Sequence, residues 1–222
     1  MDERFPKWLR VSLRKLDFLG LPNLGILICG LAILGFIGKE FLGAPLERFM
    51  FDPELVREGE WWRLFAYPIS AELTNPLWLF FYVLYVYFVM SSLEGQWGPG
   101  PLTIFTLLSY ASTIIGSIWI NRPVSVWFHV MENISLAFGT LFPDLELYLF
   151  FVIPVKAKWL SLFAGGLLLL QFVSGGGDTR LFLAVTLFPY LLFFGPFLFS
   201  TVRRRWAVRR NRRRFNGDDW RR

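Results

Sequence analysis

Three polar residues inside an apolar stretch are the strongest candidates for chemistry in this sequence. His129, Glu132 and Asn133 stand at i, i+3 and i+4, so a helix would bring them to one face. A charged group inside a bilayer costs at least about 2.5 kcal/mol on insertion scales, which makes it a functional-site candidate. Glu132 could belong to a structural network, bonded to His129 or to hydroxyls such as Ser112 and Thr113. Alternatively, the cluster could line a polar groove that receives a transmembrane segment of another protein.

The sequence offers little for metal or ion chemistry. One histidine and one glutamate supply too few ligands for a closed zinc site, which needs four. Cys29, the only cysteine, lies in an apolar run, so we expect it to pack or to face lipid, without a disulfide. Ion transport would need a string of intramembrane charges, which the sequence lacks, and it shows no internal repeat. We therefore expect no metal site and no cofactor.

The composition indicates what surrounds these residues. Apolar residues make up 55% of the 222-residue chain and charged residues 18%, against roughly 25% charged in soluble domains. A soluble core of this size could not bury so many Phe, Leu and Trp side chains, whereas lipid can solvate them. The sequence therefore predicts an all-α integral membrane protein.

Six stretches are predicted to cross the membrane, because about 20 mostly apolar residues span its hydrocarbon core. They are residues 18–38, 73–93, 101–121, 123–143, 159–177 and 181–202. The long, aromatic-rich stretch 39–72 is a loop between the first two. Residues 147–155 are apolar but too few to cross, which predicts an interfacial connector ending at Pro154.

The distribution of Lys and Arg predicts the orientation of these spans. Both termini are basic, and the connector between spans four and five holds Lys156 and Lys158. The short loops of the opposite side carry only Arg122 and Arg180. Since basic loops stay in the cytoplasm, six spans put both termini there. We thus expect a basic segment at 1–20, a membrane domain at 21–202 and an Arg-rich tail at 203–222.

The tail holds most of the positive charge of the protein. Residues 203–222 contain ten Arg and two Asp, a net +8, so the other 202 residues sum to −2 in the total of +6. A run of Arg can bind nucleic acid. Directly after an apolar span, it is more typical of a topology anchor that attracts anionic lipid, at about 1 kcal/mol per residue. We expect a lipid partner and no nucleic acid.

Sequence motifs stand at three of the expected span boundaries. Residues 61–68 read W-W-R-L-F-A-Y-P, where Trp61 and Trp62 suit the headgroup level and Arg63 can reach phosphate or loop carbonyls. Span two ends in L-E-G-Q-W-G, which contains Glu94 and Gly98. The connector after span four runs from F-P-D to P-V-K-A-K-W-L, and its motif residues are Pro143, Pro154, Lys156 and Lys158.

In their order and positions, these motifs resemble those of the rhomboid superfamily, which includes the derlins. The resemblance covers roughly residues 50–200 and implies a six-transmembrane-helix rhomboid-like bundle. Active rhomboids cleave peptide bonds inside the bilayer with a serine in G-x-S-G at the start of span four and a histidine on span six. Serine needs such an adjacent base, because it is a weak nucleophile at its free pKa.

Neither catalytic residue of the family is recognisable in this chain. The window that corresponds to G-x-S-G reads V-W-F-H at residues 126–129, and residues 181–202 contain no histidine. Ser125 lies four residues before His129 and could share its helix face, but nothing around it is identifiable as an oxyanion site. Ser135 lies about two turns deeper, in a context that does not fit the motif.

The resemblance and the missing dyad together imply a pseudoprotease that binds transmembrane segments of client proteins without cleaving them. One alternative is an intramembrane serine protease with displaced catalytic residues, and another is a purely structural membrane subunit. Because no lumenal retention motif stands at Arg221 and Arg222, a bacterial plasma (inner) membrane is favoured over an endoplasmic one.

Overall fold

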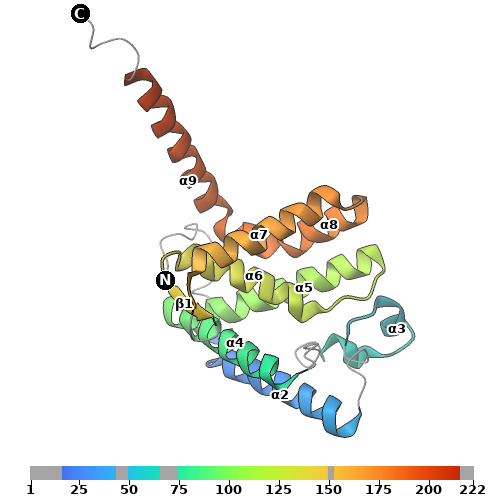
Figure 1. Ribbon diagram of the computed structural model, residues 1–222. Coiled ribbons are helices and arrows are strands. Elements are labelled where there is room, and N and C mark those ends of the chain that lie inside the picture. The colour runs from blue at the N-terminus through green and yellow to red at the C-terminus, as the bar shows by residue number, and fades with distance from the viewer. Residues whose placement is uncertain (1–16, 44–49, 66–74, 150–152, 216–222) are drawn as a thin grey trace, which may run out of the picture.

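The computed structural model describes residues 17–43, 50–65, 75–149 and 153–215, and this part of the chain is mostly helical (Figure 1). The elements are η1 (Asp17–Leu19), α2 (Leu24–Leu42), α3 (Pro53–Arg57), η3 (Trp61–Leu64), α4 (Pro76–Trp97), α5 (Pro99–Ile120), α6 (Val126–Leu141), β1 (Glu146–Leu149), β2 (Ile153–Lys156), α7 (Ala157–Ser174), α8 (Gly177–Thr186) and α9 (Phe188–Phe215). Residues 1–16 of the expected basic segment and 216–222 of the expected tail lie outside the described residues.

Four helical segments of the described chain are long and apolar enough to cross a membrane, namely Asp17–Phe41, Pro76–Trp97, Pro99–Ile120 and Ala157–Ser174. A fifth is possible if the bent pair α8 and α9 counts as one span. These segments make the chain a multi-pass membrane protein by length and composition. The expected fourth span is shorter than predicted, since α6 has 16 residues and a length of about 24 Å.

The expected sixth span, 181–202, is not one straight helix. α8 ends at Thr186, and α9 starts at Phe188 after a bend of 71°. Pro189 explains the break, because proline has no N–H to donate to the carbonyl one turn earlier, and it is tolerated only in the first turn of a new helix. Pro196, by contrast, lies inside α9.

The connector between α6 and α7 is a β-hairpin rather than a stretch that ends at Pro154. Pro154 lies within β2, where its partner across the antiparallel pair is Tyr148. Lys156 directly precedes α7 as its N-cap. The Lys158 backbone N–H donates to the Pro143 carbonyl at 3.2 Å, and the Lys158 ammonium donates to Asp144 at 2.9 Å. Pro143 and Lys158 thereby hold the base of the hairpin together.

The centre of the bundle is α5, which packs against α4, α6, α8 and α9. Its buried face is rich in small and hydroxyl side chains at helical spacing, namely Thr103, Thr106, Ser109, Ser112, Thr113, Gly116 and Ser117. Such residues let helices approach closely. A Cβ added at Gly116 would lie 2.9 Å from the ring of Phe182 on α8. This face brings α5 close enough to exchange polar contacts with its neighbours.

Candidate functional site

The aromatic loop motif is fixed by its arginine. The Arg63 side chain is buried, and it donates to the Met50 carbonyl at 2.9 Å and to Glu60 at 2.5 Å. Its guanidinium carbon lies 4.9 Å from the centre of the Trp62 ring. Trp61 and Trp62 are themselves exposed. Residues 61–65 of the motif therefore form a loop anchor that leaves two indole rings at the surface, where they suit a membrane interface, while residues 66–68 lie outside the described part of the chain.

The motif at the end of α4 joins two other helices. Glu94 accepts a hydrogen bond at 2.9 Å from the backbone N–H of Asn23, the residue before α2. Gly98 joins α4 to α5 with a φ of 88°, a left-handed conformation that glycine adopts without strain. Both residues therefore shape the bundle. Cys29 has a similar structural place, because it is buried and its thiol donates to the Val83 carbonyl at 3.5 Å.

The polar cluster of α6 divides between two faces of the helix. His129 Nδ1 and Glu132 Oε2 are 2.7 Å apart, and each side chain is 16% exposed. Asn133 is completely buried. Because a helix turns by about 100° per residue, Glu132 and Asn133 lie on opposite flanks of His129. One flank reaches the surface and the other faces the core.

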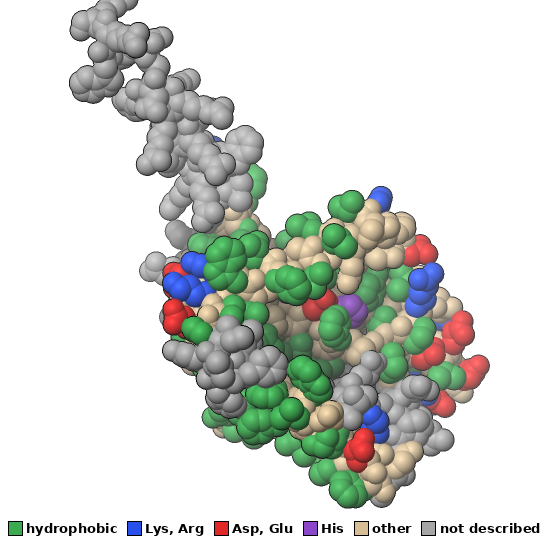
Figure 2. Space-filling view, in the orientation of Figure 1, with side chains coloured by type: hydrophobic (Ala, Val, Ile, Leu, Met, Phe, Trp, Pro, Cys, Tyr) green, Lys and Arg blue, Asp and Glu red, His purple; other side chains and the backbone are tan. Residues whose placement is uncertain are grey.

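The outward face of α6 lies between α4 and α7. The Ser135 hydroxyl is 2.6 Å from the Tyr85 hydroxyl of α4, and the Ser135 carbonyl accepts a hydrogen bond at 2.9 Å from Ser161 of α7. Trp127 Nε1 donates to the Tyr82 hydroxyl of α4. Figure 2 shows a hollow on this side of the molecule, with the only histidine of the chain (purple) next to an acidic side chain (red) at its edge. His129, Glu132 and Ser135 follow one another at intervals of three residues along this face.

The surroundings of the His129–Glu132 pair are mainly aromatic. The imidazole centroid lies 4.9 Å from that of Phe182 and 5.5 Å from that of Phe128, both edge-to-face. In the part of the chain that the structure describes, neither His129 Nε2 nor Glu132 Oε1 has a hydrogen-bond partner. Since lipid offers no hydrogen bonds, these two atoms need a polar partner wherever water is excluded.

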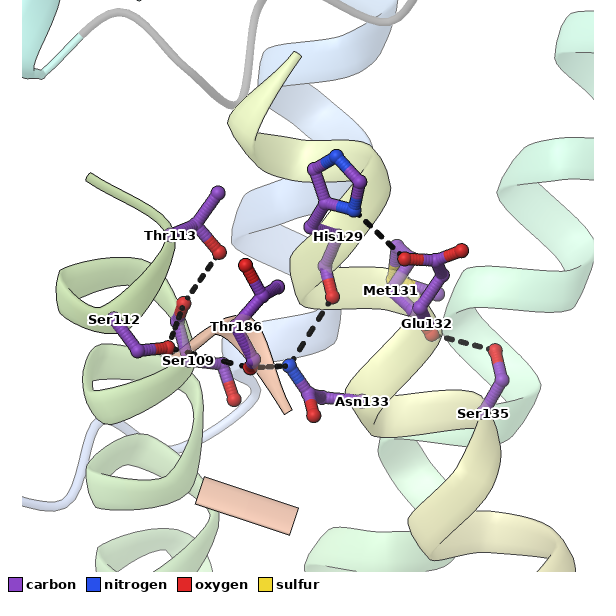
Figure 3. Close-up of polar contacts among 9 residues, drawn as sticks. All are labelled: Ser109, Ser112, Thr113, His129, Met131, Glu132, Asn133, Ser135 and Thr186. Atoms are coloured by element: carbon purple, nitrogen blue, oxygen red, sulfur yellow. Dashed lines mark hydrogen bonds and ion pairs between the residues drawn. The ribbon is translucent and has the colours of Figure 1, made fainter. Parts of the chain in front are cut away.

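The core-facing flank is a network that joins α5, α6 and α8 (Figure 3). Asn133 Nδ2 donates to the Thr186 carbonyl at 2.9 Å and to the His129 carbonyl at 3.3 Å. The Ser112 hydroxyl reaches the same Thr186 carbonyl at 3.4 Å and the Ser109 carbonyl at 3.0 Å. Thr186 is the last residue of α8, so its carbonyl is one that the break between α8 and α9 leaves without a helical partner. Asn133 and Ser112 cap this broken helix end.

Ser125 and His129, which the sequence allowed as a catalytic pair, do not form a hydrogen bond in the structure. Ser125 stands before the first residue of α6, and none of the described serine hydroxyls forms a hydrogen bond with His129. The Ser135 hydroxyl is engaged by Tyr85 and by the Met131 carbonyl at 2.6 Å. Phe128, at the position expected for the family's nucleophile, is 60% exposed. Within the described ranges, no group of three His, Cys, Asp or Glu residues could hold a metal ion.

Sequence reasoning missed the residues of neighbouring helices that bond to each flank of α6. Tyr82 and Tyr85 of α4 stand at i and i+3 on the helix face toward α6, and this spacing was the available signal. Thr186 was not detectable, because its role depends on where α8 ends.

Comparison of the chain with models of known protein families, with curated proteins and with solved structures gave no match. The rhomboid resemblance therefore stays a prediction that rests on the motifs.

Proposed function

We propose that this membrane protein is a rhomboid-like pseudoprotease that binds a transmembrane segment of a client protein along the outward face of α6. The observation that carries the proposal is the His129–Glu132 pair, which lies partly exposed among aromatic rings and has two polar atoms without a partner among the described residues. A polar side chain from a client helix could pair with both atoms. Burying them unpaired in lipid would be costly.

The neighbouring helices favour a transmembrane helix as the occupant. α4 and α7, on either side of this face, carry exposed apolar side chains such as Leu84, Phe88, Leu162 and Phe163. The apolar side chains of α4 and α7 suit a lipid-embedded segment, whereas the His129–Glu132 pair favours a segment that carries a hydrogen-bond donor. Hydrogen bonds between helices in membranes are worth about 1–2 kcal/mol in peptide models. The client segment should therefore carry a polar residue near its middle.

The proposal includes six spans, with α6 as the fourth and α8 plus α9 as the sixth. A short helix and a broken one are tolerated at membrane depth where neighbouring helices satisfy their backbone groups, as Asn133 does for Thr186. Both termini then lie in the cytoplasm of a bacterial cell, with the Arg-rich tail on the anionic leaflet. Cysteine-accessibility labelling should place residues 1–15 and 205–222 on the same, cytoplasmic side, and labelling of the tail from outside would contradict six spans.

The proposal also includes catalytic silence, because His129 has no serine hydroxyl within reach among the described residues. We expect neither labelling by a serine-directed fluorophosphonate nor cleavage of a reporter transmembrane substrate. Cleavage together with labelling that disappears in Ser125→Ala or Ser135→Ala would restore the protease alternative.

Photocrosslinking in native membranes tests client binding. A photoreactive residue at Phe128, beside His129, should give discrete protein adducts that Glu132→Leu abolishes. The control position is Leu34, which is exposed on α2, a helix that packs against α4. Adducts that are the same from both positions, or that persist in Glu132→Leu, would contradict the proposal.

A further inference from the structure

Three buried polar atoms at the core-facing network have no hydrogen-bond partner among the described residues. They are Ser109 Oγ on α5, Asn133 Oδ1 on α6 and Thr186 Oγ1 on α8. Each of these residues is at most 1% exposed. Buried polar atoms in folded proteins are nearly always satisfied by protein or by ordered water. In Figure 3 the Thr186 hydroxyl points away from the other two oxygens, so Ser109 Oγ and Asn133 Oδ1 are the pair that points to one missing partner.

The chemistry of two of these atoms defines that partner. Asn133 Oδ1 only accepts hydrogen bonds, whereas the Ser109 hydroxyl can donate one and accept others. In Figure 3, both oxygens point to the same side of the Thr186 carbonyl, yet they form no bond with each other. A molecule between them must accept from the hydroxyl and donate to the amide oxygen.

We propose that an internal water molecule occupies this place and bridges Ser109 on α5 to Asn133 on α6. A monovalent cation fits less well, because the oxygens here are all neutral and Glu132 faces the other flank of α6, bonded to His129. An uncompensated charge in a low-dielectric interior is far more costly than a water molecule with two partners. The inference does not depend on client binding.

The water would complete the support of the broken helix. Asn133 Nδ2 and Ser112 hold the Thr186 carbonyl from two sides, and the bridge would fix the Asn133 amide in the orientation that this contact requires. In membrane proteins, ordered water is one of the means by which freed backbone groups at a helix break are satisfied. α5, α6 and the α8 end would then move as one unit.

The direction in which Ser109→Ala changes the Tm tests the proposal. If the hydroxyl binds a bridging water, its removal should lower the Tm in detergent by about 2–4 °C. If the hydroxyl is unpaired, Ala removes a buried unsatisfied group, so the Tm should stay or rise. Ser117→Ala is the matched control, since that buried hydroxyl on the same helix donates to the Arg122 carbonyl, and its loss should lower the Tm.

Two further measurements identify the bound species. A high-resolution density map should show a peak within hydrogen-bond distance of Ser109 Oγ and Asn133 Oδ1 that is absent in Ser109→Ala. The Tm should be equal in sodium chloride and choline chloride. A Tm that does not fall in Ser109→Ala, an empty map at this place, or a sodium-specific rise of the Tm would each overturn the water assignment.

Discussion

The two polar flanks of α6 differ in whether their side chains can be reached from the surface. Asn133 is fully buried, and its amide nitrogen holds carbonyls of α6 and α8. The His129–Glu132 pair, on the adjacent flank, reaches the surface and leaves one atom of each residue without a protein partner in the described chain. Neighbouring residues of one helix thus serve a network that is closed off from the surface and a pair that is open to it.

The neighbouring helices decide which flank is closed. The core flank packs against α5, whose hydroxyl-rich face contains Ser109 and Ser112. It also meets the end of α8, where the Thr186 carbonyl has no partner within its own helix. The outward flank lies between α4 and α7, which contact α6 through Tyr85 and Ser161 but do not pair with His129 or Glu132. Closed polar groups should matter for stability, and open ones for binding.

The largest effect should follow from Asn133→Leu. This change removes the Asn133 amide bonds to the Thr186 and His129 carbonyls and leaves the buried end of α8 with only the longer contact from Ser112, at about 2–3 kcal/mol. Thermal unfolding in detergent should show a clearly lower Tm than in Glu132→Leu, the matched change on the open flank. Equal Tm values for the two variants would remove the distinction between the flanks.

Two polar residues outside α6, Arg63 and Glu94, should also contribute to stability, as Asn133 does. Arg63→Ala removes partly buried bonds to Met50 and Glu60, and Glu94→Ala removes the exposed bond to Asn23. We expect each variant to lose about 1–2 kcal/mol of unfolding free energy. Arg63→Lys is the control, because it keeps the charge but not the planar guanidinium, and should fall between. Unchanged melting of both alanine variants would contradict the anchor role.

Glu132→Gln should have a smaller effect on stability and a larger one on binding. The residue is partly exposed, and its only described partner is His129. We expect the unfolding free energy to stay within about 0.5 kcal/mol of the wild type, while the client adducts from position 128 weaken. Strong destabilisation in the same melting assay would place Glu132 in the structural network instead.

The smallest effect concerns a pair outside both flanks. A hydrogen bond from Lys158, together with its charge, holds the pKa of Asp144 below its usual range. Because the folded pKa lies below the unfolded one, the pair stabilises the fold above the usual pKa of Asp and loses this contribution as the pH falls through the folded pKa. Asp144→Asn should melt slightly below the wild type at neutral pH and equal it in acid. A Tm difference between Asp144→Asn and the wild type that grows in acid would contradict a stabilising Lys158–Asp144 pair.

The apolar helices were predictable from the sequence, whereas the breaks and partners were not. Hydropathy located the helices α2, α4, α5 and α7, because each is a long apolar run. The mean hydropathy of residues 181–202 does not depend on whether the segment is bent. Pro189 was the one visible sign of the break between α8 and α9.

The candidate site was predictable as a cluster but not as two flanks. Spacings of three and four residues brought His129, Glu132 and Asn133 to one side of α6, but the 100° between Glu132 and Asn133 sends them to different neighbours. Which neighbour each one meets depends on tertiary packing against α5 and α8. No local pattern in the sequence encodes that choice.

Binding of a defined transmembrane helix tests the central claim most directly. Labelled protein in lipid vesicles would be titrated, by energy transfer, with a polyleucine helix carrying one central Asn and with its all-leucine counterpart. We predict binding of the Asn helix alone, with affinity falling about tenfold in His129→Leu and Glu132→Leu and unchanged in Leu34→Ala, an exposed position on α2. Equal binding of both helices, or full affinity in His129→Leu and Glu132→Leu, would contradict the claim that the open flank of α6 is a client site.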